Sequence, residues 1–365
     1  MSRCRATVPT RQAAIARFSQ AAIVRLGQSG AALLSAMLTV TLVASFASAA
    51  LWQQYRSFEV ESAERARLQS SLILTGALDW ARLILREDAR AGGADHLAEP
   101  WAVPLQEARL SSFLAVDGTT SDADRDAFLS GSIVDMQGQL NIANLVDGAV
   151  VSSTGLASFE RLFERLDLPP QALQTLADNY LAAAKNANLA GIVGPVGAAG
   201  AVGSISPADG VLPQRTHQLG WLGVDEATVA ALAPYVTVLP GRSPVNLNTA
   251  SSMVLAASTP GLGTAGAEKL IAARSRKHFN SLADAAQALG SPGVLFADGV
   301  HSVTSRFFEV RGQLRLDDLT VFERSLVQRD GLSVRTVWRV RGVVNDATTP
   351  GAALAPPAAG NLPRP

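Results

Sequence analysis

Cysteine is nearly absent from this 365-residue sequence, and aromatic side chains make up only 5% of it. Because Cys4 is the single cysteine, no intramolecular disulfide can form, and stability has to come from packing. The four histidines are scattered without an HExxH pair or a cysteine partner, which leaves zinc without a site. The sequence also lacks a GxSxG motif and a close carboxylate pair of the kind used in catalysis. We therefore expect that the protein is not an enzyme and has no cofactor.

Charged side chains are missing from Leu26 to Tyr55, and within this stretch Ala31–Trp52 is a predominantly apolar block. A helix of about 20 residues spans the ~30 Å hydrocarbon core of a bilayer, so residues 31–52 are predicted to be a transmembrane segment. Five arginines precede the block, and the first acidic residue is Glu59. This charge pattern predicts a single membrane pass, with the N-terminus in the cytoplasm and the rest of the chain on the far side.

A glycine stands before the apolar block rather than after it. A secretory signal peptide is cut after its apolar core. Cleavage after Gly30 would instead remove a leader of residues 1–30 and keep the helix on a mature protein that begins at Ala31. That order is typical of type IV pilins and pseudopilins. Removal of the leader leaves 26 basic and 31 acidic residues, and the resulting net charge of −5 argues against a polyanion-binding protein.

Hydrophobic periodicity extends the helix beyond the membrane block. Apolar residues recur at helical spacing in a stripe formed by Leu74, Leu78, Ala81 and Leu85. The Gly92-Gly93 pair ends the pattern. We therefore expect one helix of roughly 60 residues, on the order of 90 Å long, with half of it in lipid and half on a soluble domain.

The remainder of the chain divides by its periodicity. Residues 150–299 are mostly helical, interrupted at 185–216 by a stretch rich in Gly, Ala, Val and Pro that we interpret as a flexible loop. Residues 300–342 alternate as three strands, and residues 343–365 are predicted to be disordered. We predict an α+β fold in which residues 53–149 and 300–342 form one α/β domain and an all-helical segment, 150–299, is inserted into it.

Several longer stretches resemble one protein family. They are GAALL at Gly30–Leu34, DHLAEPWA at Asp95–Ala102, IVDMQGQLNIANL at Ile133–Leu145, PYVTVLPGRSPVNLNTA at Pro234–Ala250 and PGLGTAGAEKLIAAR at Pro260–Arg274. With the three final strands they extend over most of the mature chain. In this order they resemble the minor pseudopilin of the K type, general secretion pathway protein K, of type II secretion systems.

The resemblance implies a pseudopilin fold: a long N-terminal transmembrane helix and a small antiparallel sheet, with a large inserted helical domain. It implies that prepilin peptidase processes the chain at the inner membrane, that Ala31 is methylated, and that the C-terminal domain is periplasmic. The implied partners are the I-type and J-type minor pseudopilins and other pseudopilins, at the pseudopilus tip. There the subunit would initiate or cap an assembly that exports folded proteins across the outer membrane. The stripe from Leu74 to Leu85 is then expected to stay free to pack on partners.

Ser35 occupies the fifth position of the mature chain, where most pilins carry glutamate. That glutamate is thought to neutralise the N-terminal ammonium of a neighbouring subunit, and an unpaired carboxylate at that depth in lipid is costly. An uncharged Ser35 suits a subunit with no neighbour above it. The alternative interpretation is that Ser35 is only a small residue that the helix tolerates, with no role in assembly.

Three glycines, Gly261, Gly263 and Gly266, satisfy the GxGxxG pattern. A dinucleotide site requires a strand before this pattern, whereas Pro260 and a helical segment precede it here. We interpret the glycines as the turn of a helix-hairpin-helix, SAM-like unit, in which they allow a tight crossing.

Helix-hairpin-helix turns also bind DNA phosphates through backbone N–H groups. Basic residues follow the turn at Arg274, Arg276, Lys277 and His278. A membrane-anchored DNA-binding or uptake protein is therefore the alternative function. The net charge of −5 and the lack of a wider basic stripe favour a packing role with no nucleic-acid partner.

An acidic stretch offers weak candidates for calcium. Asp122, Asp124 and Asp126 resemble the start of a calcium loop, although Ala127 replaces the turn glycine and Ile133 the terminal glutamate. We interpret the stretch as a solvated loop. A family calcium site is not transferred, because the Gly/Ala-rich loop replaces the acidic segment that relatives carry.

Overall fold

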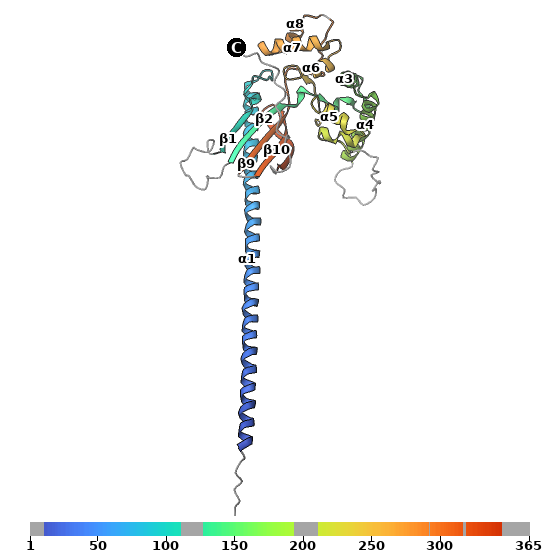
Figure 1. Cartoon of the computed structure of the whole chain (residues 1–365). Helices are drawn as coiled ribbons and strands as arrows, with labels where there is room; N and C mark the ends of the chain where they lie inside the picture. The colour runs from blue at the N-terminus through green and yellow to red at the C-terminus, as the bar shows by residue number, and fades with distance from the viewer. Residues whose placement is uncertain (1–10, 111–126, 193–210, 292, 317–318, 345–365) are drawn as a thin grey trace, which may run out of the picture. The chain divides into compact units, whose positions relative to one another are not determined.

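A long helix opens the computed structural model, which describes residues 11–110, 127–192, 211–291, 293–316 and 319–344 (Figure 1). The side chains of residues 11–30, 188–192, 343 and 344 are not part of this description. Helix α1 runs from Arg11 to Ala91, so it begins before the expected start at Ala31 and ends where the glycine pair predicted. Its Ala31–Ala91 part is long and apolar enough to cross a membrane, by length and composition. The chain divides into two compact units, Met1–Gln69 and Ser70–Pro365.

A five-stranded antiparallel sheet forms the centre of the second unit. Its strands, in spatial order, are β1 (Leu105–Arg109), β2 (Ala127–Asp135), β9 (Phe307–Leu316), β10 (Leu319–Asp330) and β11 (Ser333–Val344). The last three strands are the meander that the alternating sequence predicted, with Gly331 at positive φ in the second hairpin. Strand β2 pairs with β9 over its whole length, from Ala127↔Leu316 to Asp135↔Phe308. The chain therefore leaves the sheet after Asp135 and returns to it at Phe307.

The C-terminal part of α1 packs on one face of this sheet. Leu78, Ala81 and Leu85 are buried in a cluster with Phe308 and Val310 from β9. Leu74 is buried one turn earlier against Leu314 and Val321. The expectation that this stripe stays free for partners is wrong, because the protein's own sheet covers it.

The segment between β2 and β9 contains most of the helices. One short helix, η1 (Pro100–Ala102), lies before the sheet. The elements between β2 and β9 are η2 (Met136–Gly138), β3 (Leu140–Asn141), η3 (Ile142–Leu145), β4 (Val146–Asp147), β5 (Val150–Val151), α3 (Ser153–Arg165), α4 (Pro170–Ile192), η4 (Thr216–Leu222), α5 (Glu226–Leu232), β6 (Val236–Thr237), β7 (Val245–Asn246), α6 (Ser252–Ser258), α7 (Gly263–Arg276), α8 (Leu282–Leu289) and β8 (His301–Ser302).

Local sequence explains where these helices begin. Ser152, Asp225, Ser251 and Ser281 each precede a helix and accept a hydrogen bond from a backbone N–H in its first turn. A side-chain oxygen at this position satisfies one of the donors that a helix N-terminus leaves unpaired. The helices of this segment share one hydrophobic core, which contains large side chains such as Phe159, Leu176, Leu219, Leu255 and Leu270.

Two expectations for this segment are corrected. It is not all-helical, since β3 pairs with β6, β4 with β5 and β7 with β8. The stretch 185–216 does not begin as a loop either, because α4 continues to Ile192. Alanine is the strongest helix former, and the run of alanines before that point supports the extension. Residues 193–210 of the expected loop lie outside the described residues.

Candidate functional site

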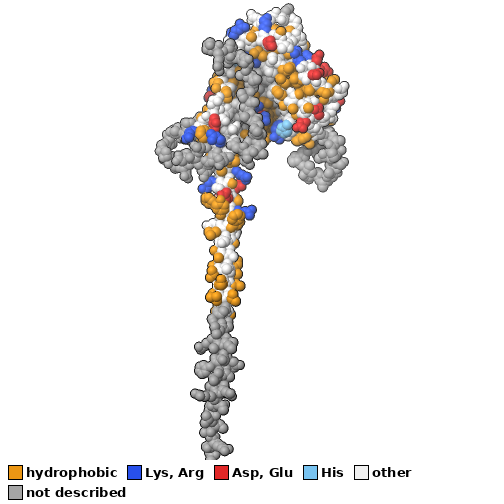
Figure 2. Space-filling model, in the orientation of Figure 1, with side chains coloured by type: hydrophobic (Ala, Val, Ile, Leu, Met, Phe, Trp, Pro, Cys, Tyr) orange, Lys and Arg blue, Asp and Glu red, His pale blue; other side chains and the backbone are white. Residues whose placement is uncertain are grey.

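The N-terminal half of α1 carries the residues predicted for processing and assembly. Gly30 and Ala31 both lie within the helix. Residues 31–60 are exposed throughout, and Figure 2 shows apolar side chains gathered along this part of α1. The Oγ of Ser35 donates a hydrogen bond to the backbone oxygen of Ala32 at 2.9 Å. The hydroxyl at position five is therefore satisfied by its own helix and brings no charge.

The VNLNTA segment forms a polar junction between the sheet and the segment inserted in it. Its first asparagine, Asn246, donates from Nδ2 to the Asp135 Oδ2 at 3.0 Å, the Ser305 Oγ at 2.9 Å and the Asp95 backbone oxygen at 3.1 Å. Asp135 also accepts from the Thr249 Oγ1 at 2.6 Å and the Ser305 Oγ at 2.7 Å. Burial raises the pKa of Asp135, and these donors oppose that rise. Residues from four distant parts of the chain thus meet at one buried carboxylate.

The second asparagine of the segment holds the end of α7. The Asn248 side chain accepts from the Phe279 N–H and donates to the Phe279 oxygen, both at 2.9 Å. Arg274 donates to the Leu247 oxygen at 2.6 Å, and burial lowers the pKa of this guanidinium to about 10. The VNLNTA segment therefore has a structural role: its hydrogen bonds hold the C-terminal end of α7 and the residues after it in place.

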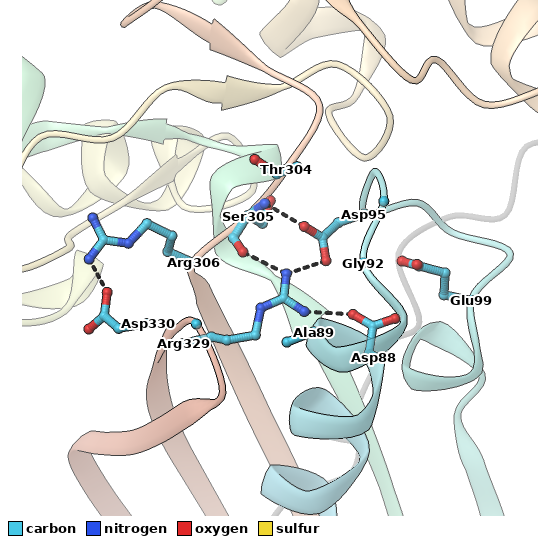
Figure 3. A pocket seen from close by; sticks show the side chains of 12 residues that line it. Asp88, Ala89, Gly92, Asp95, Glu99, Thr304, Ser305, Arg306, Arg329 and Asp330 are labelled. Atoms are coloured by element: carbon cyan, nitrogen blue, oxygen red, sulfur yellow. Dashed lines mark hydrogen bonds and ion pairs between the residues drawn. The ribbon is translucent and has the colours of Figure 1, made fainter.

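An acidic cluster lies beside this junction, at the end of α1 (Figure 3). Carboxylate oxygens of Asp88, Asp95 and Glu99 lie within 4.8 Å of one another, which is close enough for a metal ion. The guanidinium of Arg329 occupies the cluster, however: it pairs with Asp88 at 2.6 Å and with Asp95, and it donates to the Ser305 oxygen at 2.9 Å. An arginine that bridges two carboxylates forms charge-assisted hydrogen bonds to both and offsets one of their two charges.

Glu99 differs from its two neighbours: no dashed line in Figure 3 joins its carboxylate to Arg329. It accepts hydrogen bonds from the His96 N–H at 2.8 Å and the Trp101 Nε1 at 2.7 Å. Burial raises the pKa of Glu99 to about 7. Burial also raises the pKa of Asp95, against the opposing charge of Arg329. We interpret the cluster as an ion-pair network that ties α1 to β10.

The turn of the expected helix-hairpin-helix lies between α6 and α7. Gly261 and Gly263 have φ values of 74° and 65°, a conformation that favours glycine. A Cβ at Gly266 would lie only 2.7 Å from the Leu262 Cδ1. These glycines thus serve the backbone turn and the close packing of α7, as the sequence predicted.

The basic residues after this turn are mostly engaged within the protein. Arg274 is half-buried, and the Nε of Arg276 donates to the Ala272 oxygen at 3.1 Å. The ring of His278 stacks on His96, with centroids 3.8 Å apart and planes 12° apart. Sequence reasoning missed this histidine pair, because 182 positions separate its two members. Of the four residues predicted to bind phosphate, Arg276 and Lys277 remain exposed.

The remaining sequence candidates do not meet at a site. Asp122, Asp124 and Asp126 lie outside the described residues. His301 is buried, with its Nε2 2.9 Å from the Thr259 Oγ1, and burial lowers its pKa to about 4. The other histidine outside the pair, His217, is exposed on η4.

Comparison with known proteins gives a consistent result. The family model described as type II secretion system (T2SS), protein K matches residues 245–304, and a second model with the same description matches residues 138–241. The type II secretion system protein K of Pseudomonas aeruginosa PAO1 is 28% identical over 329 residues, which cover 87% of this chain and 94% of that protein.

A solved structure supports the same fold. A chain of the crystal structure of the GspK-GspI-GspJ complex from the enterotoxigenic Escherichia coli type 2 secretion system superposes with a TM-score of 0.53. The match is 17% identical and covers 77% of this chain and 98% of that chain. At this identity the match supports a shared fold. The chain is therefore similar to type II secretion system protein K, in its segments 138–241 and 245–304 and over most of its length.

Proposed function

We propose that this protein is the tip subunit of the type II secretion pseudopilus, where it initiates or caps the assembly that exports folded proteins. In this proposal α1 anchors the precursor in the inner membrane and the remainder is periplasmic. The observation that carries the proposal is a single chain that combines the apolar Ala31–Ala91 helix with a segment matched by protein K models. A helix of this kind supplies the anchor and the shaft, and the matched segment supplies the family-specific part.

Processing follows from the position of Gly30 ahead of the apolar stretch. We propose that prepilin peptidase cuts after Gly30 and that Ala31 becomes the methylated N-terminus. Ser35 then stands at position five, with its hydroxyl bonded to its own helix. Because Ser35 brings no carboxylate, it cannot pair with the ammonium group of another subunit, which fits a subunit at the end of a filament.

Bulk is the second argument for the tip. The segment between β2 and β9 is longer than the five strands of the sheet together. We propose that this segment is an inserted domain, with a SAM-like unit at α6 and α7, and that its size prevents further subunits from stacking above it. The named partners of the solved relative, GspI and GspJ, suggest that I-type and J-type pseudopilins are the partners here.

Co-purification tests the proposal on the full chain. The tagged protein is expressed with the I-type and J-type pseudopilins of the same strain and extracted from membranes in a mild detergent. We expect a complex that contains one copy of each subunit, measured by light scattering corrected for detergent. Filaments built from this chain alone, or failure to retain either partner, would contradict the tip assignment.

A further inference from the structure

The face of the sheet opposite α1, called the outer face below, carries two arginines around one buried carboxylate. Phe308 and Val310 of β9 pack toward α1, so Glu309 and Arg311, which alternate with them, belong to the outer face. Arg324 of β10 lies opposite Arg311 in the register. Glu309 is 1% exposed and accepts from the Arg311 Nε at 2.6 Å and from the Arg324 Nη2 at 2.8 Å. One carboxylate therefore holds two guanidinium groups, and one positive charge remains.

The inserted segment lies against the outer face beside this pair. Its Leu239 is buried in a cluster with Leu326 of β10, which stands directly opposite Glu309. The Thr216 Oγ1 donates to the Val236 oxygen at 3.3 Å, which ties the start of η4 to β6, the strand shortly before Leu239. These contacts hold the start of η4 near the two arginines.

Arg215 and His217, on either side of Thr216, complete a basic cluster with Arg311 and Arg324. His217 is exposed on η4. Partial burial and then the nearby charges of Arg215 and Arg324 lower its pKa, so both guanidinium groups lie within electrostatic reach of the ring. Arg215 is half-buried, and its guanidinium forms no ion pair with any residue that the structure describes. Three guanidinium groups around one carboxylate leave a net charge of +2 when His217 is neutral.

The surroundings of the basic cluster are polar on one side and apolar on the other. Ser132 of β2 lies opposite Arg311, and its hydroxyl side is half-buried. Val340 of β11 lies opposite Arg324, and Trp338 on the same strand is also half-buried. The Arg324 side chain itself is 51% exposed. Charge, hydrogen-bonding groups and apolar side chains thus lie together, as a polypeptide ligand requires, whereas an inorganic anion would use the guanidinium groups alone.

A long polyanion fits this surface less well than a short acidic segment. The chain after Gly30 has a net charge of −5, which repels an extended anion at long range. Nucleic-acid binding requires a stripe of cations that meets many phosphates in succession. The basic cluster is instead one compact group, and its excess charge matches about two carboxylates.

We propose that the basic cluster is a docking surface for a short acidic segment of another polypeptide, whose carboxylates pair with the cluster and whose apolar side chain contacts Trp338. The guanidinium of Arg215 supplies a fork of donors that suits a carboxylate. Glu309 holds the other two arginines in place before the partner arrives, which reduces the ordering that binding requires. The inference does not depend on the proposed tip function.

Fluorescence anisotropy on the full chain in detergent tests the surface. The probe is a labelled peptide with glutamates on both sides of one leucine, and the comparison peptide carries lysines in place of the glutamates. We expect micromolar binding of the acidic peptide that weakens as salt rises, and no binding of the basic one. Arg215→Gln should weaken binding about tenfold, as for the loss of one charge-assisted pair. Arg276→Gln removes the same charge from an exposed arginine of α7 and should leave binding unchanged.

Two results of this titration would overturn the proposal. One is the absence of acidic-peptide binding at low salt. The other is equal weakening by Arg215→Gln and Arg276→Gln, which would show attraction to the charge of the whole chain and not to this surface. The thermal unfolding of Arg215→Gln should match the wild type, because this arginine has no ion pair to lose among the described residues.

Competition then identifies the class of ligand. Unlabelled acidic peptide should displace the probe, and inorganic phosphate should need a concentration at least tenfold higher to do the same. Displacement by phosphate at the same concentration as the peptide would show a site for free anions and overturn the polypeptide assignment. Duplex DNA that binds more tightly than the peptide, with a loss of affinity in Arg215→Gln, would overturn it in favour of a nucleic acid. Each outcome is separate from the co-purification that tests the tip function.

Discussion

His301 shows how a single buried side chain can make the fold sensitive to acid. Its ring is 3% exposed, its Nδ1 accepts from the Ala297 N–H at 3.2 Å, and its Nε2 faces the Thr259 hydroxyl. Burial lowers the pKa from 6.5 to about 4, so between these values the unfolded chain binds a proton that the folded chain does not. The stability that comes from a neutral His301 is therefore present above pH 6.5 and is lost as the pH falls toward 4. The full loss is on the order of 3 kcal/mol.

This linkage predicts the behaviour of one variant. We expect the free energy of unfolding of the detergent-solubilised protein to fall between pH 7 and pH 4, and to fall less steeply in His301→Gln. His217 provides a comparison: partial burial and the nearby charges of Arg215 and Arg324 lower its pKa as well, but it is exposed, so His217→Gln should change the pH dependence less than His301→Gln does. Parallel stability curves for the wild type and His301→Gln would show that this histidine does not carry the effect.

Single elements were predictable where the physics is local. The end of α1 at Gly92, the meander hairpin and the Gly261–Gly266 turn follow from backbone preferences that each short stretch carries by itself. Helical periodicity also identified the Leu74–Leu85 stripe correctly as one face. Periodicity does not show what covers a face. The stripe was expected to be free for partners, but it is buried in the protein's own core.

The Gly261–Gly266 turn, interpreted from the sequence as a helix-hairpin-helix turn, allows a specific prediction about DNA. Arg274 donates to a backbone oxygen and His278 stacks on His96, so Arg276 and Lys277 are the two exposed cations of residues 274–278, a small patch on a chain whose part after Gly30 has a net charge of −5. We expect the full chain in detergent to show no salt-dependent affinity for duplex DNA tighter than about micromolar in fluorescence anisotropy at physiological salt. Tighter binding that weakens with salt, and that is lost on Lys277→Ala, would instead support the DNA-binding alternative.

For the whole molecule, sequence alone could not supply the contacts that join its parts. The VNLNTA segment is recognisable by resemblance, but the partners of Asn246 are Asp95, Asp135 and Ser305, which lie 151, 111 and 59 positions away. Neither composition nor periodicity encodes such pairings. The ion pairs of Arg329 with Asp88 and Asp95 are similarly remote, at 241 and 234 positions. Long-range polar contacts decide how the inserted segment is held on the sheet, and they become visible only in the folded protein.

These contacts predict that the sheet and the inserted segment unfold together. Asn246 donates one of several hydrogen bonds that the buried Asp135 accepts, and the loss of one such bond costs about 0.5–1.5 kcal/mol. In hydrogen exchange measured by mass spectrometry under mild denaturant, we expect peptides from β9 and from α6 to open at one common rate in the wild type. Asn246→Ala should separate the two rates. Asn179→Ala should not, since the Asn179 amide bonds only to the Leu222 oxygen within the inserted segment. If β9 and α6 already exchange independently in the wild type, the buried junction does not couple them, and the inserted segment opens separately from the sheet.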